Sequence, residues 1–334
     1  MRYFFLTAAV AILLGAQTGW SADETAEKTS PADDAISVKG CRLGEESVQH
    51  WKVGVIVTAK GGPCRGIVAT VPVPIDWPEQ EVRVVDEQSS PFAKVGDRLV
   101  AGTVKQMLIN IPMLPAGEVV EVTVTFEVAR RALLQPADTS IFQLPPVKKL
   151  PKDIRPFLGP SPYIESRHRK IISLSKEIMT EKESEGAWAQ VEGLFDWVRE
   201  HMTPSRSPIP LKGAVKALAD GNGDCEDLSS LFIALCRAGN IPARTVWVPG
   251  HCYPEFYLND DEGVGHWFPC EPHGARAFGE TPEQRPVLQK GDNFRVPERP
   301  RDRQRYVAEF LTGAGGKPSV KWIRESLSGG ATAP

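Results

Sequence analysis

Residues 221–239 have the sequence GNGDCEDLSSLFIALCRAG, and they decide the fold of the second half of the chain. Asp224 follows two glycines and is a good N-cap residue, and Asp227 has the spacing of a capping box. Apolar residues then recur at helical spacing, at Leu228, Leu231, Phe232 and Leu235. Gly239 and the Ile-Pro pair soon after it end the pattern. The sequence therefore predicts an amphipathic helix whose first turn contains Cys225.

The position of Cys225 in this first turn has chemical consequences. The unpaired N–H groups and the positive end of the helix dipole favour a thiolate over a thiol. The same N–H groups are suited to hold the oxyanion of a tetrahedral intermediate formed at the sulfur. Asp224, Glu226 and Asp227 act in the opposite direction, because nearby negative charge raises the pKa of a thiol. A nucleophilic Cys225 therefore requires a base from elsewhere in the chain.

Three blocks of the sequence resemble the transglutaminase-like superfamily, whose members have a papain-like fold and a Cys-His-Asp triad. The first block is GNGDCEDLSSLFIALCRAGNIPAR, the second is HCYPEFY from His251, and the third is WFPCEP from Trp267. The third block is similar to Trp-x-Pro-x-Asp-Pro but has Glu271 where the family usually has Asp. The resemblance is specific over residues 185–275. It implies a nucleophile at Cys225, a base at His251 and an orienting carboxylate at Glu271.

The strands around the polar segment 259–263 provide a check that does not use the resemblance. This segment predicts a hairpin turn between two strands. If Leu258 pairs with Val264, the numbers of paired residues sum to 522 along the ladder. His251 and Glu271 then lie opposite each other on one face, with Cβ atoms about 5 Å apart. The pattern thus supports an imidazole that is oriented by a carboxylate.

Other polar residues of this region keep more than one interpretation. The resemblance implies a second oxyanion donor upstream of the nucleophile, and three residues qualify by their order in the chain: Trp188, Trp197 and Ser205. Glu255 occupies a position that is often acidic in the family, with a structural, substrate-binding or catalytic role. His266 ranks second as the base, because the predicted register places it opposite Phe256 and away from an acid.

The six cysteines bear on whether Cys225 is free, since the thiols of exported proteins are often oxidised to disulfides. A fully bridged set in any of its pairings would leave no nucleophile. The sequence also permits two disulfides, Cys41–Cys64 and Cys252–Cys270. Cys236 is then a buried small apolar residue and Cys225 stays free. A zinc site is a further alternative with a spacing that fits no common zinc pattern; its ligands would be His251, Cys252, His266, Cys270 and His273. No cofactor and no metal are expected.

The beginning of the chain predicts export. The chain has 334 residues, enough for two domains, and a net charge of −3 gives no electrostatic case for nucleic acid. Residues 1–22 have the pattern of a secretory signal peptide, and residues 23–35 form an acidic flexible leader. We expect a periplasmic or secreted protein that does not remain inserted in a membrane after cleavage.

Hydrophobic patterning divides the rest of the chain. Residues 36–130 alternate in the manner of an antiparallel β-sandwich, and residues 131–162 form a proline-rich linker. Residues 163–312 form the transglutaminase-like domain, and residues 313–334 form a flexible C-terminal tail. A basic run that ends at Arg305 is interpreted as solvated surface. The predicted fold class is α+β, with a papain-like core of helices on an antiparallel sheet after an all-β sandwich.

Two functions from different classes are compatible with these residues. The first is an exported cysteine enzyme that acts on amide bonds of peptides or proteins, cell-wall peptides included, through a thioester. The thioester is released by hydrolysis or by acyl transfer to an amine. The second is a catalytically inactive fold that binds proteins or the cell wall, because Glu271 in place of Asp lengthens one arm of the triad. Selective alkylation of Cys225 by iodoacetamide distinguishes them.

Overall fold

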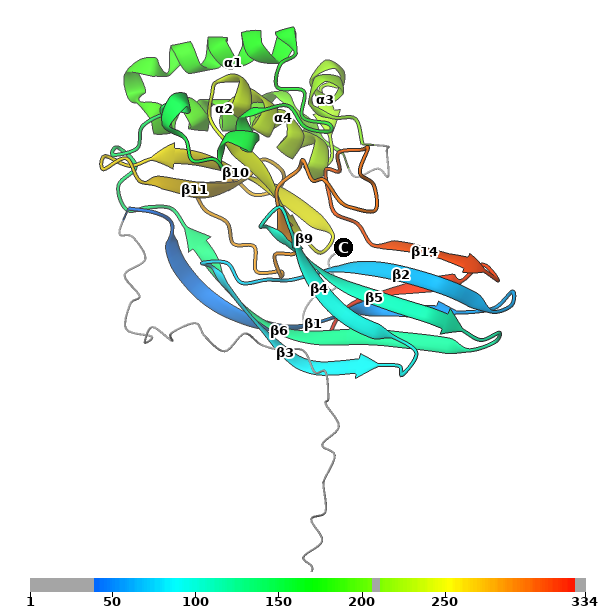
Figure 1. Ribbon diagram of the computed structural model, residues 1–334. Helices are drawn as coiled ribbons and strands as arrows, with labels where there is room; N and C mark the ends of the chain where they lie inside the picture. Colours follow the sequence, from blue (N-terminus) through cyan, green and yellow to red (C-terminus); the bar gives the residue numbers. More distant parts are fainter. Residues whose placement is uncertain (1–38, 206–210, 328–334) are drawn as a thin grey trace, which may run out of the picture. The chain divides into compact units, whose positions relative to one another are not determined.

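The computed structural model describes residues 39–205 and 211–327, which contain a β-sandwich and an α+β core (Figure 1). The mixed α+β class expected from the sequence is confirmed. Both parts belong to one compact unit. The predicted signal peptide and leader, residues 1–35, lie outside the described residues. Among the described helices, none has the length and apolar character that crossing a membrane requires.

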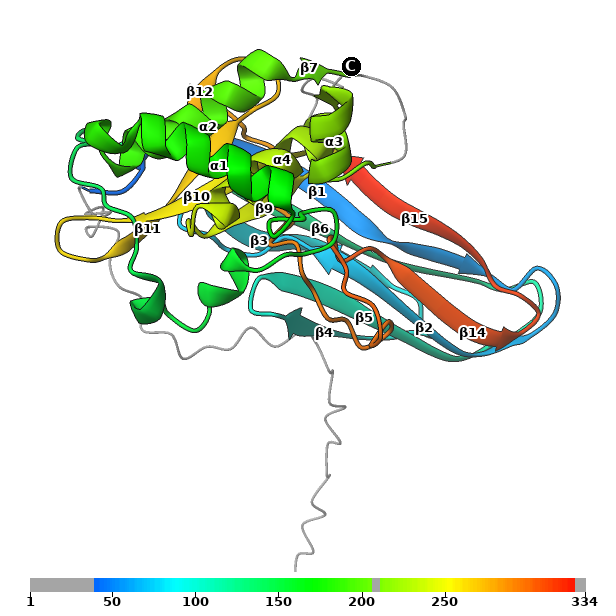
Figure 2. The same cartoon turned by 90° about the horizontal axis from the view of Figure 1, so that it is seen from above.

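The sandwich consists of two four-stranded antiparallel sheets (Figure 2). The first contains β1 (Arg42–Thr58), β3 (Gln80–Ser89), β6 (Val119–Leu134) and β15 (Ser319–Ser326) in the order β15-β1-β6-β3. The second contains β2 (Cys64–Val73), β4 (Lys94–Val100), β5 (Val104–Leu114) and β14 (Phe310–Gly315) in the order β14-β2-β5-β4. Valines that alternate along β1 and β6 pair directly, as in Val55↔Val122 and Val57↔Val120, and form the core with β2 and β5.

The prediction of a flexible C-terminal tail at residues 313–334 is wrong for the part that the structure describes. Strand β14 pairs with β2, and β15 pairs with β1 through residues 319–326. Ile323 is buried opposite Gly54. The glycine-rich turn suggested fraying, but a Cβ at Gly316 would lie 2.2 Å from the carbonyl oxygen of Gly62. This glycine permits the close approach that lets the end of the chain cover two sheet edges.

The core consists of a five-stranded antiparallel sheet with helices packed against it. Its strands are β9 (Ala243–Val248), β10 (His251–Asn259), β11 (Gly265–Glu271), β12 (Ala277–Phe278) and β13 (Gln289–Lys290), in the order β12-β11-β10-β9-β13. Its α-helices are α1 (Arg169–Glu181), α2 (Ala187–His201), α3 (Ala214–Asp220) and α4 (Cys225–Ala238). Three 3₁₀ turns, η1 (Val147–Lys149), η2 (Arg155–Leu158) and η3 (Glu183–Glu185), and a short parallel pair, β7 (Thr203–Pro204) with β8 (Asn222–Gly223), complete it.

Helix α4 begins and ends where the sequence predicted. The Asp224 side chain caps it by accepting hydrogen bonds from two backbone N–H groups in the first turn, both at 3.0 Å. The capping box does not form, because the Asp227 carboxylate accepts from the N–H groups of Lys212 and Gly213. Gly239 is the C-cap of α4, and the position requires glycine because a Cβ there would lie 2.2 Å from the sulfur of Met179 on α1.

The predicted hairpin of β10 and β11 is present, but its register differs from the predicted one by two residues. The observed pairs, such as Asn259↔Gly265, sum to 524. Asp260 sets the turn, since its carboxylate accepts the N–H groups of Glu262 and Val264 at 2.9 Å. A shift of two leaves each side chain on its predicted face. His251 and the residues of β11 that face it therefore remain on the same side of the sheet.

We predict that truncation after Glu309 destabilises the sandwich strongly. It removes β14 and β15, exposes the edges of both sheets and deletes the buried Ile323 side chain. Loss of a buried isoleucine alone costs about 2–5 kcal/mol, so the melting temperature is expected to fall by about 10 °C or more. Thermal melts followed by circular dichroism test this. Truncation after Leu327 keeps both strands and is the control, and equal melting temperatures for the two proteins would contradict the prediction.

Candidate active site

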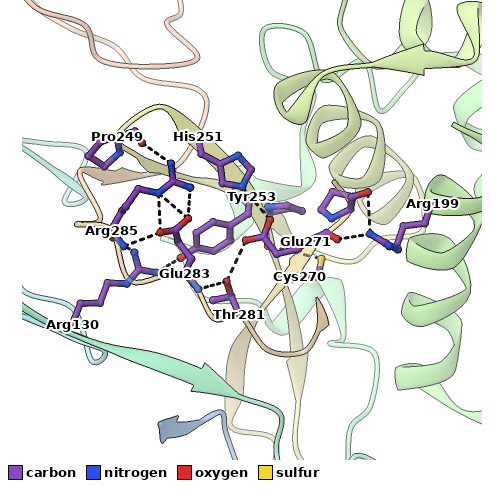
Figure 3. A network of polar contacts seen from close by, with 12 residues as sticks. Arg130, Arg199, Pro249, His251, Tyr253, Cys270, Glu271, Thr281, Glu283 and Arg285 are labelled. Atoms are coloured by element: carbon purple, nitrogen blue, oxygen red, sulfur yellow. Dashed lines mark hydrogen bonds and ion pairs between the residues drawn. The ribbon is translucent and has the colours of Figure 1, made fainter. Parts of the chain in front are cut away.

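The three residues predicted as a triad come together at one edge of the core. Cys225 is the first residue of α4, His251 is the first residue of β10, and Glu271 is the last residue of β11. His251 Nε2 lies 3.1 Å from Glu271 Oε2 (Figure 3). Cys225 and His251 line the same cavity, and the hydrogen bond from Cys252, together with the hydrogen bonding and the charge of His251, lowers the pKa of the Cys225 thiol. Because Nε2 faces the carboxylate, Nδ1 is the ring nitrogen left for the sulfur.

The backbone fixes both sides of this contact. The turn before His251 contains Gly250 with φ 72°, a conformation that glycine adopts without strain. Helix α4 runs through the apolar core, so Cys225 stands at the end of a rigid element. Near its far end, Arg237 forms an ion pair of 2.8 Å with Asp292, and both side chains are 1% exposed. The sulfur and the imidazole are thus held by elements with little freedom to move.

The surroundings of Cys225 favour a thiolate next to an imidazolium. A hydrogen bond from the side chain of Cys252 is the main cause that lowers the pKa of Cys225, burial opposes it, and the hydrogen bond and charge of His251 add to the lowering. The resulting pKa is about 4. Burial lowers the pKa of His251, but its hydrogen bonds to Cys225 and Glu271 outweigh this and raise the pKa to about 10. Between these values the pair is ionised.

Cys252 contributes to the site in a way that was not expected from the sequence. The side chain is 1% exposed, and its pKa lies well above the ordinary value because of the hydrogen bond to Cys225 and because of burial. It therefore stays a neutral thiol that donates to the Cys225 sulfur, and its backbone N–H donates to the same atom. Its position beside His251 in the sequence is the available signal, but the sequence pattern indicates Cys252 only as a disulfide partner or a zinc ligand.

All six cysteines are free, so neither permitted disulfide is present. The shift of the hairpin register explains why Cys252 and Cys270 are not joined by a disulfide. The sulfur of Cys270 lies 3.9 Å from the carbonyl oxygen of Pro254 instead. Cys41 packs against the α+β core, whereas Cys64 lies in the core of the sandwich. The expectation that Cys236 is a buried apolar residue agrees with its place inside α4.

Two cavities lie on either side of His251. One, of about 540 Å³, is lined by Cys225 and His251 together with aromatic and basic side chains: Trp51, Trp247, Tyr306, Arg305 and Arg324. The other, of about 580 Å³, is lined by His251, Glu271 and side chains of β6 and of residues 273–285. Each has the size of a pocket for part of a peptide. The sulfur is therefore reached from the first cavity, and the carboxylate from the second.

The basic run is not wholly solvated surface, contrary to the expectation from the sequence. Arg305 forms an ion pair with Glu226, the residue after Cys225, and also lies 5.1 Å from the centre of the Trp247 ring. Burial raises the pKa of Glu226 to about 7, against the opposing effect of Arg305. Arg305 thus offsets a negative charge that would disfavour the Cys225 thiolate.

The other residues singled out in the sequence lie elsewhere. Trp188 is part of an aromatic cluster in the core, and Trp197 stacks on His201 along α2. Ser205, the third proposed oxyanion donor, is bonded to the segment before the nucleophile, since its backbone N–H donates to the carbonyl of Gly223. His266 bonds to Asp260 at 2.9 Å in the hairpin turn. In the described parts of the chain, no group of His, Cys, Asp and Glu is placed to hold a metal ion.

Glu255 has a structural position. Its carboxylate is buried and lies 2.7 Å from both Arg244 and Lys290, and Lys290 also pairs with Glu79 at 2.7 Å. Burial raises its pKa, but the two cations outweigh burial and lower the pKa to about 2. This cluster joins β10 to the segment before β3. The structural interpretation of Glu255 therefore has the contacts to support it.

The fold and this site define a class: a cysteine-enzyme-like α+β core with a thiol at the start of a buried helix and an imidazole and a carboxylate on adjacent strands. The resemblance found in the sequence is confirmed, because residues 172–272 match the profile of the Transglutaminase-like superfamily.

Solved structures provide a second comparison. The chain is similar to a "Putative Cysteine Protease" from Cytophaga hutchinsonii, with a TM-score of 0.54 and 20% identity over 86% of this chain and 94% of that one. A "putative protease" from Parabacteroides distasonis, with a TM-score of 0.27 and 12% identity over 65% of this chain and 42% of that one, is too dissimilar to support an argument. No curated protein matches the sequence. At this identity the first likeness shows the fold.

We predict that Cys252→Ala raises the pKa of Cys225, because it removes the hydrogen bond that contributes most to the lowering. Loss of a hydrogen bond to a charged group shifts a pKa by about 1–2 units, so the acidic limb of the pH profile of alkylation should move to higher pH by that amount. The rate of iodoacetamide alkylation between pH 3 and 9 measures it. Cys270→Ala, another buried thiol, is the control and should leave the limb in place. Superimposable profiles for the two variants would count against the role of Cys252.

We predict that Glu255→Gln destabilises the protein at pH 7 by about 3–5 kcal/mol, because it leaves buried cations without their partner. The folded pKa is below the ordinary value of 4.5, so the stabilising charge is present above pH 4.5 and is lost as pH falls toward 2. The difference from wild type should therefore shrink between pH 7 and pH 3. Thermal melts at both values test this, and a difference that grows on acidification would contradict it.

Proposed function

We propose that this protein is a cysteine enzyme that acts on amide bonds of peptides or proteins through a thioester. The observation that supports it best is the convergence of Cys225, His251 and Glu271, with the sulfur held as a thiolate beside the imidazolium. A thiolate is the nucleophilic form of cysteine, and an oriented imidazolium is the acid that a leaving amine requires. The aromatic cavity next to Cys225 is large enough for the acyl part of a peptide.

The reaction follows from the positions of these groups. The Cys225 thiolate attacks the carbonyl carbon, and the oxygen of that carbonyl becomes an oxyanion. Asp224 already occupies the N–H groups of Glu226 and Asp227, so the Cys225 N–H is the donor left in the first turn of α4 for the oxyanion. His251 then gives its proton to the amine, the C–N bond breaks, and a thioester remains on Cys225. Glu271 keeps the imidazole in the required orientation.

Release of the thioester completes the cycle. Water or a second amine attacks the thioester carbon while neutral His251 accepts its proton, and the thiolate leaves. Water as acceptor makes a peptidase or amidase, and an amine makes an acyltransferase. Both outcomes use the same three residues, so the acceptor decides between them. Assays of peptide hydrolysis and of amine incorporation on the same labelled peptides separate the two.

We also propose that the protein is exported, from the signal-peptide pattern of residues 1–22. Cell-wall peptides are then among its candidate substrates. N-terminal sequencing of the protein recovered from a periplasmic or secreted fraction should give a mature chain that begins near residue 22 or 23. Recovery of the intact N-terminus from the cytoplasm alone would contradict export.

We predict that Cys225→Ala and His251→Ala each reduce kcat/KM by about 10³-fold or more on any peptide that the wild type cleaves, because the nucleophile or its acid is lost. Cys236→Ala, a buried thiol further along α4, is the matched control and should keep most of the activity. A well-folded wild type without hydrolysis, transfer or selective alkylation of Cys225 would instead favour the binding module.

We predict that Glu271→Asp is impaired, although Asp is the usual residue in the family. The backbone of this chain places the longer carboxylate 3.1 Å from His251, and shortening it by one methylene withdraws the oxygen from the ring. Misplacement by about 1 Å costs about 10²-fold in rate. Comparison of kcat for Glu271→Asp with Glu271→Gln tests this, and an Asp variant as active as wild type would show that the carboxylate is not position-sensitive.

A further inference from the structure

The sandwich contributes no catalytic group, but its strand β6 is connected to the catalytic carboxylate through Thr281, a residue of the segment after β12. The Thr281 hydroxyl lies 3.2 Å from Glu271 Oε1, the carboxylate oxygen that does not face His251 (Figure 3). Its oxygen accepts the backbone N–H of Glu283 at 3.1 Å. A hydroxyl has one proton, and the accepted bond leaves that proton for the carboxylate. Thr281 is 1% exposed, so water does not compete for it.

The sandwich fixes the backbone of Thr281. Leu133, near the end of β6, donates its N–H to the Thr281 carbonyl at 3.1 Å and accepts the Thr281 N–H at 2.8 Å. These two bonds form an isolated antiparallel bridge between β6 and the segment after β12. The orientation of the Glu271 carboxylate therefore depends on a strand that belongs to the sandwich and not to the core sheet.

The same strand also holds the surroundings of His251. Arg130 of β6 is fully buried and donates a hydrogen bond of 2.7 Å to the hydroxyl of Tyr253. Tyr253 lies two residues after His251 in β10. It also donates to the carbonyl of Arg285, whose guanidinium donates to the carbonyl of Pro249 at 3.0 Å. Strand β6 thus contacts the segment after His251 directly and the segment before it through Arg285 (Figure 3).

We propose that Thr281 is a positioning residue for the triad and that strand β6 of the sandwich, through Leu133, holds it in place. The inference rests on the proposed function, since it assigns a role to groups around Glu271. With one oxygen bonded to His251 and the other to Thr281, both carboxylate oxygens are engaged and the rotation of the group is restricted. The sandwich is then part of the active-site scaffold, in addition to any part it takes in recognition.

Thr281→Val tests the hydroxyl, because valine has nearly the same shape and no donor. We expect kcat to fall about 10-fold with little change in KM, and the acidic limb of Cys225 alkylation to move up by about 0.5 pH unit, since a less firmly held carboxylate weakens the ion pair. Thr281→Ser restores the hydroxyl and should restore both quantities. Thr70→Val is the matched control, because Thr70 is a buried threonine of β2, in the sheet without β6, whose hydroxyl accepts from Gln106 at 3.3 Å.

Hydrogen exchange on the wild-type protein tests the role of β6 without a variant. Peptides that cover residues 277–283 should lose protection together with peptides that cover residues 128–134 as urea is raised. Early exchange of 277–283 while β6 remains protected would overturn the inference. So would a Thr281→Val protein that matches Thr70→Val in kcat and alkylation profile. Absence of alkylation in the wild type is a different result, because it refutes the proposed function itself.

Discussion

The structure depends on one constraint: a charged sulfur and a charged imidazole must be kept side by side in a site that is mostly shielded from water. Burial alone would keep Cys225 a thiol and His251 neutral. The two charges are stable only if each keeps its hydrogen-bond partners within reach, because an unpaired buried charge costs several kcal/mol, about 3–5 in measured cases. Three elements must therefore keep their relative positions: the start of α4, the start of β10 and the end of β11.

The local charges show how this balance is reached. Asp224 is needed to cap α4, and Glu226 follows the nucleophile, so negative groups surround the thiolate. Cys252 offsets them with two donors, one from its side chain and one from its backbone, and Arg305 pairs with Glu226. The donors come from β10 and from a segment after the core sheet. Reactivity at Cys225 is therefore a property of the assembled fold and not of the helix end alone.

The features that were predicted correctly from the sequence are local or tolerant of small errors. Helix α4 was predictable because its cap and apolar stripe lie within one segment. The approach of His251 and Glu271 was predictable despite a register error of two, since such a shift keeps the face of each residue. The pairing of β14 and β15 with the sandwich, the Thr281–Leu133 bridge and the Cys252 donor were not. They depend on contacts between distant segments, and no period in the sequence marks them.

The proposed chemistry requires Cys225 to be a thiolate at neutral pH, and ultraviolet absorbance of the thiolate measures this directly. The difference between wild type and Cys225→Ser, recorded from pH 3 to pH 10 on protein shown to be folded by tryptophan fluorescence, isolates this one sulfur. We predict a single step near pH 4. A step near the ordinary value of 9.0 would mean that neither Cys252 nor His251 stabilises the charge, and would contradict the proposed mechanism.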